Sequence, residues 1–66
     1  MAGNTRGKIK EHLEGVHRNC DWQTHHLQTV LALIEDKNPK LSESIKLLAK
    51  SIEEVDKFNQ LIYSNI

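Results

Sequence analysis

The sequence has very few of the residues that cross-link a small protein or interrupt its helices. Among 66 residues there is one cysteine, Cys20, and one proline, Pro39. A single cysteine excludes a disulfide within the chain, and with it the disulfide framework of many small secreted proteins. The three glycines all lie in the first quarter of the chain. Two long segments therefore run without a strong helix breaker.

Aromatic residues and net charge are also scarce. One Trp, one Tyr and one Phe are too few for the stacking platform that binds single-stranded nucleic acid. Nine basic side chains balance nine acidic ones, which leaves no overall field to attract a polyanion or an anionic membrane. The first residues lead into Lys8 and Lys10, and no segment approaches the roughly 20 apolar residues that span a bilayer. We expect a cytoplasmic protein with no membrane partner and little to attract a nucleic acid.

What the sequence does contain is two rows of mostly apolar residues at alternating steps of four and three. The first row is Ile9, Leu13, Val16, Cys20, Gln23, Leu27, Val30 and Ile34. The second row is Leu41, Ile45, Leu48, Ile52, Val55, Asn59, Ile62 and Ile66. This heptad spacing predicts helices over about residues 5–36 and 39–64. The polar members, Gln23 and Asn59, either set the register, as a buried Asn does in coiled coils, or lie at an exposed rim.

A short turn at residues 37–38 is predicted to join the helices. Asn38 suits an N-cap and Pro39 the first helical position. When the rows are paired across this turn, Ile34 with Leu41 and so on to Ile9 with Ile66, the two numbers of every pair add up to the same total. An antiparallel hairpin requires this, because both helices rise about 1.5 Å per residue. The predicted fold is one all-α domain over residues 1–66, an antiparallel, coiled-coil-like helical hairpin.

Further apolar residues lie outside the two rows and are predicted to form an interface. They are Trp22, Leu31, Leu33, Leu47, Phe58, Leu61 and Tyr63. They widen the apolar arc beyond what one partner helix covers, and so short a chain buries little surface by itself. A homodimer that forms a four-helix bundle would cover them. The alternative is that the same surface binds an unrelated protein.

The first predicted helix contains the residues that could bind a metal. All four histidines lie there: His12, His17, His25 and His26. His17, Asp21 and His25 follow at intervals of four and share a helix face, so they are the candidate metal ligands. Histidines on an exposed face are usually only solvated, and Cys20 in the apolar row is usually a small buried hydrophobe. Glu14-x-x-His17 has the di-iron spacing but lies outside the row.

Catalytic and phosphate-binding motifs are absent from the sequence. We find no Gly-rich phosphate loop, nucleophile elbow or Ser/His/Asp set, and therefore expect no enzyme activity and no cofactor. Arg6, Lys8, Lys10 and Arg18 are weak candidates for contacts with nucleic-acid phosphates. The electronegative end of the second helix is a structural reason for positive charge at the start of the first.

In architecture, the predicted hairpin resembles the Rop family of small plasmid RNA-binding proteins, whose helical hairpins dimerise into a four-helix bundle. The resemblance covers the whole chain in shape, and no RNA-contact motif matches. It implies a small RNA- or DNA-binding regulator as an alternative function.

Residues 26–31, with the sequence HLQTVL, and residues 61–63, with LIY, resemble apolar stretches in the dimerisation and phosphotransfer hairpins of sensor kinases. When Leu27 and Gln28 are aligned with that family, its acceptor histidine falls at Cys20 or Asp21. This resemblance implies a phosphotransfer-like bundle in which only the solvent-facing His25 could accept phosphate. Our leading expectation is a non-catalytic protein that acts by protein–protein interaction, and a phosphotransfer-like or metal-binding bundle is a further alternative.

Overall fold

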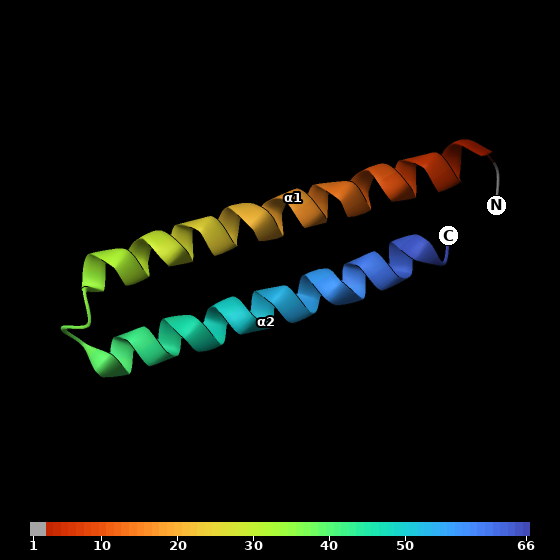
Figure 1. The fold of residues 1–66 in the computed structure, drawn as a ribbon. Coiled ribbons are helices and arrows are strands. Elements are labelled where there is room, and N and C mark those ends of the chain that lie inside the picture. The colour runs from red at the N-terminus through yellow and green to blue at the C-terminus, as the bar shows by residue number, and fades with distance from the viewer. Residues whose placement is uncertain (1–2) are drawn as a thin grey trace.

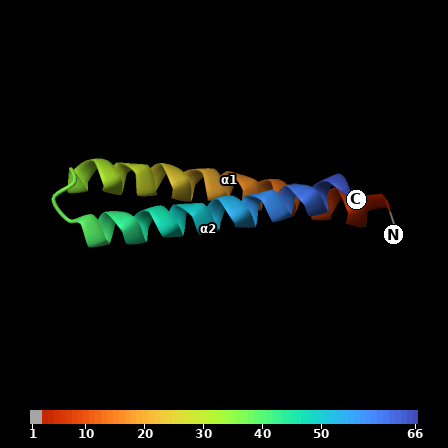
Figure 2. The ribbon, with the colours of Figure 1, turned by 60° about the horizontal axis from the view of Figure 1, so that its bottom comes forward.

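The protein is a rod of two antiparallel helices. A computed structural model describes residues 3–66, in which α1 spans Gly3–Ile34 and α2 spans Pro39–Ser64. The helices run side by side along the rod, so the start of α1 and the end of α2 lie at the same end (Figures 1 and 2). The rod measures 54 × 15 × 11 Å. The predicted all-helical hairpin is confirmed.

The turn between the helices begins earlier than predicted. Glu35 and Asp36 have φ angles of 51° and 61°, and this left-handed backbone ends α1 at Ile34 rather than at residue 36. The Asn38 side-chain oxygen accepts a hydrogen bond from the Leu41 backbone N–H at 3.2 Å. Pro39 follows as the first helical residue. The start of α2 therefore has the N-cap and the proline that the sequence indicates.

The boundary between the helices is rotated relative to the predicted rows. The side chains with reduced exposure along it include Leu13, His17, Cys20, Thr24, Leu27, Leu31 and Ile34 of α1, Ser42, Ile45, Ala49, Ile52, Asp56, Asn59 and Tyr63 of α2, and Ile66 beyond the end of α2. Every second member of each predicted row keeps its place. Among the alternate members Ile9 and Val30 stay half-buried, and the others are exposed while the next residue along the chain lies at the boundary. Successive helical residues differ in direction by about 100°. Compared with the prediction, both helices are therefore rotated about their axes, and facing residues still lie at the same height along the rod.

This rotation leaves predicted core residues at the surface. Val16, Leu48 and Val55 are exposed, and so are Leu41, Ile62 and Gln23. The physical reason is that the apolar arc of each helix is wider than one partner helix can cover. The two helices pack against each other along the edge of their apolar arcs, where polar side chains form hydrogen bonds across the boundary. The rest of the arc faces outward.

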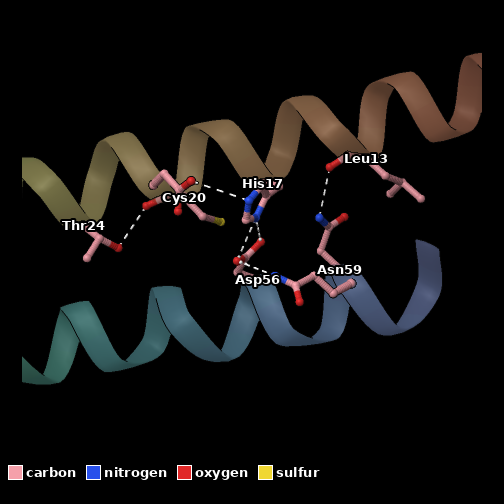
Figure 3. Close-up of polar contacts among 8 residues, drawn as sticks. Leu13, His17, Cys20, Thr24, Asp56 and Asn59 are labelled. Carbon is pink, nitrogen blue, oxygen red and sulfur yellow. Dashed lines mark hydrogen bonds and ion pairs between the residues drawn. The ribbon is translucent and has the colours of Figure 1, made fainter. Parts of the chain in front are cut away.

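Asn59 is the clearest of these polar contacts. It is only 6% exposed, and its side-chain N–H donates to the Leu13 backbone carbonyl at 3.0 Å (Figure 3). A buried amide that bonds to the backbone of the other helix favours the rotation at which α2 packs against α1. Gln23, the other polar residue of the predicted rows, is exposed. Asn59 therefore bonds across the boundary, whereas Gln23 lies at its exposed rim.

Candidate functional site

The most unusual feature of the surface is its content of large hydrophobic side chains. Ten of them are between 39% and 77% exposed: Val16, Trp22, Leu33, Leu41, Leu47, Leu48, Val55, Phe58, Leu61 and Ile62. Within residues 3–66, Cys20 is the only hydrophobic residue classed as buried. Single exposed hydrophobes are ordinary on a monomer, but a contiguous set indicates a binding surface.

Five of these ten side chains, Val16, Leu41, Leu48, Val55 and Ile62, lie on one side of the hairpin. Leu41, Leu48, Val55 and Ile62 follow at intervals of seven and therefore form one row along α2. A shallow groove is lined by Gln23 and His26 of α1 together with Leu48 of α2, over a floor formed by Leu27 and Ile52. Gln23 is seven residues after Val16, so Val16 belongs to the same side. We call this side, defined by the Leu41–Leu48–Val55–Ile62 row and by Val16 and Gln23, the apolar face.

The opposite side of the boundary is polar. A second hollow there is lined by Leu13, Glu14, His17, Asn59, Gln60, Tyr63 and Ser64. The Tyr63 hydroxyl donates to the Glu14 carboxylate at 2.8 Å, and this hydrogen bond, more than partial burial, raises the pKa of Tyr63. We call this side the polar face. The hairpin is therefore amphipathic as a whole, and its two faces are separated by the line where the helices meet.

The residues predicted to form an interface divide into two groups. Trp22, Leu33 and Leu47 are exposed, as are Phe58 and Leu61. Leu31 and Tyr63 instead lie half-buried along the boundary within the hairpin, and their place in an interface stays a prediction. The Leu41–Leu48–Val55–Ile62 row was predicted to lie in the core and is instead exposed. The sequence did contain a signal for this alternative. Pairs whose residue numbers add up to one more than in the predicted pairing, such as Cys20 with Asp56, also lie at equal heights in an antiparallel hairpin.

A histidine–aspartate cluster links the two helices on the polar face. The Nδ1 atom of His17 lies 2.9 Å from both carboxylate oxygens of Asp56, and its Nε2 atom lies 3.5 Å from the Asp21 Oδ2 atom (Figure 3). The Gln60 side-chain N–H donates to Asp56 Oδ2 at 3.0 Å. The hydrogen bond to Asp56, with the charges of Asp56 and Asp21, raises the pKa of His17 above 6.5. His17 was predicted to lie outside the core and is instead half-buried at the boundary.

Cys20 lies beside this cluster, and its thiol is in an environment that disfavours reaction. Its side chain is buried, and burial, together with the negative charges of Asp56 and Asp21, raises the pKa of the thiol. The thiolate is the form that attacks electrophiles and binds metals. A neutral, buried thiol fits the predicted role of a small hydrophobe.

The basic side chains predicted as weak nucleic-acid contacts lie along α1. Arg6 donates to the Ile66 backbone carbonyl, and the Lys10 Nζ atom lies 5.1 Å from the centre of the Tyr63 ring. These cations thus lie beside the end of α2, as the helix-dipole explanation predicts. Lys8 and Arg18 are exposed. Two of the four candidate nucleic-acid contacts therefore interact with Tyr63 or Ile66, at the C-terminal end of the hairpin.

His25 faces solvent. Its ring lies edge-on to that of Trp22, with 6.3 Å between centroids, and it lines an open hollow with Arg18, Asp21 and Trp22. It does not belong to the His17–Asp21–Asp56 group, whose ligand atoms lie within 4.8 Å of one another. Asp56 therefore takes the place that the sequence analysis assigned to His25.

Comparison of the chain with protein-family models, with curated proteins and with solved structures finds no match. Neither helix, within the part of the chain that the structure describes, has a stretch long and apolar enough to cross a membrane.

Proposed function

We propose that this protein is a non-catalytic interaction protein, and that its apolar face packs against a second copy of the chain to form a four-helix bundle. The observation that carries the proposal is the row Leu41, Leu48, Val55 and Ile62, which is exposed at heptad spacing. Heptad rows pack well against other helices, because each side chain enters a gap between residues of the facing helix. Two amphipathic hairpins related by a two-fold axis would bury four such helices around one core.

The size of the face supports a second copy as the occupant. The broad side of the rod has an outline of 54 × 15 Å, which leaves room for the roughly 800 Å² of accessible surface that each partner buries in a stable interface. A second hairpin has the same length and the same groove, so the two faces cover each other from end to end. A shorter or globular partner would leave part of the row in water.

Charge also favours self-association. The chain has nine basic and nine acidic side chains, so two copies approach without net repulsion. No charged residue belongs to the apolar face as defined, so no unpaired charge would be buried in the contact. A partner of strong net charge would gain nothing from this face.

Sedimentation equilibrium over a range of protein concentrations tests the proposal. The chain mass is 7.6 kDa, and we expect the apparent mass to approach twice that value at micromolar concentration. Circular dichroism on the same samples would establish that the chain is helical. A helical monomer at about 100 μM, a concentration at which a stable interface of this size is saturated, would refute the homodimer.

A further inference from the structure

The histidine–aspartate cluster on the polar face is not used by the proposed interaction. It combines two side chains of α1, His17 and Asp21, with Asp56 of α2, and one ligand atom from each lies within 4.8 Å of the others. Imidazole nitrogens and carboxylate oxygens are common ligands of zinc and related divalent cations.

The hydrogen bond to Asp56 determines which nitrogen of His17 is free. Because Nδ1 lies 2.9 Å from the Asp56 oxygens, Nδ1–H donates to the carboxylate in the neutral ring, and the lone pair then lies on Nε2. Metal-binding histidines generally have this arrangement, in which a carboxylate accepts from the other ring nitrogen and orients the ring. Gln60 in turn holds Asp56 Oδ2 at 3.0 Å.

The free nitrogen already faces a second ligand atom at a suitable separation. His17 Nε2 and Asp21 Oδ2 are 3.5 Å apart. In a tetrahedral site with metal–ligand bonds of 2.0–2.2 Å, two ligand atoms are separated by about 3.3–3.6 Å. His17 and Asp21 are one helical turn apart on a rigid helix, so a cation can enter without a change in the backbone.

We propose that His17 Nε2 and Asp21 form a binding site for a divalent cation of the zinc class, that Asp56 orients His17, and that water completes the coordination. The neutral imidazole and the two carboxylates carry a local charge that a divalent cation neutralises. With two protein ligands we expect saturable binding below about 1 mM zinc. The Asp21 side chain is 71% exposed, so the cation enters directly from solvent.

This site is independent of the proposed dimer. The cluster lies on the polar face, and the contact between copies uses the apolar face. A failure of one proposal therefore leaves the other to be judged by its own measurement.

Titration calorimetry of the chelator-treated protein with zinc chloride, in mildly alkaline buffer, tests the site. We expect one zinc per chain. His17→Gln should abolish saturable binding, and Asp21→Asn should weaken it at least tenfold. Asp56→Asn should weaken it by about 10- to 100-fold, the usual effect of losing a residue that orients a ligand. His25→Gln is the matched control, a histidine on the same helix outside the cluster, and it should bind zinc as the unmodified chain does.

A second measurement separates coordination from folding. In ¹⁵N spectra of the histidine side chains, zinc should shift the Nε2 resonance of His17 and leave that of His25 in place. Because Asp21 is exposed, Asp21→Asn should keep the helical circular dichroism while losing affinity. The proposal is overturned if no saturable binding occurs below about 1 mM zinc, if His17→Gln binds normally, or if His25→Gln removes the binding.

Discussion

Leu48 offers the sharpest test of the apolar face. It is 50% exposed and lines the groove opposite Gln23. Full burial of a leucine side chain is favourable by about 1.5–3 kcal/mol. Because half of Leu48 is still exposed, its burial by a partner should contribute about 1 kcal/mol to binding. A two-fold dimer contains the contact twice. Leu48→Ala should therefore weaken dimerisation by about 2 kcal/mol, or roughly 30-fold in Kd.

Leu48→Lys should have a larger effect, because it places two like charges near the centre of the contact without partners. We expect Leu48→Lys to be a monomer at concentrations where the unmodified chain is a dimer. The assay is sedimentation equilibrium, with circular dichroism to establish that the hairpin remains helical. Half of Leu48 is already covered within the hairpin, so some loss of monomer stability should accompany the change.

Gln28→Lys provides the matched control. Gln28 is exposed and lies two heptads after Glu14, which places it on the polar side of α1. The variant introduces the same side chain without touching the apolar face, and its dimerisation should be unchanged. Equal dissociation of both lysine variants, or an unaltered dimer in Leu48→Lys, would refute the assignment of the interface.

Three further predictions concern single contacts within the hairpin. Asn59→Ala removes the bond to the Leu13 carbonyl and should lower the free energy of unfolding by about 1–2 kcal/mol in urea titrations at fixed protein concentration; a neutral change would show that this bond does not favour the observed packing. The single tyrosine, Tyr63, should ionise above pH 10 in an absorbance titration, and Glu14→Gln should bring the midpoint back toward 10. Because the folded-state pKa is raised, the phenol stabilises the fold below about pH 10, and this contribution is lost as the pH rises through the raised pKa; identical midpoints would contradict the contact. Cys20, buried and with a raised pKa, should react with thiol reagents far more slowly than the urea-unfolded chain, and labelling at the unfolded rate in native buffer would contradict its burial.

Part of the candidate site could be read from the sequence, and part could not. His17 and Asp21 are one turn apart on a helix, so their proximity follows from spacing alone. Asp56 is far away in the chain and reaches them only across the boundary between the helices. His25 has the same spacing from Asp21 as His17 has, yet it faces solvent beside Trp22. The spacing of residues along one helix cannot show whether the third member of the cluster comes from the same helix or from the other one.

The sequence by itself determined the two helices, the cap at Asn38 and the level at which α2 lies against α1. These depend on local chemistry and on the rise per residue, which is the same in both helices. Only the tertiary structure decided how each helix is rotated about its axis. Rows offset by one residue match equally well in level, and the choice depends on cross-helix contacts such as His17 with Asp56 and Asn59 with the Leu13 carbonyl. That rotation turns Leu48 and its row outward, and it is the reason the hairpin has a face available for a partner.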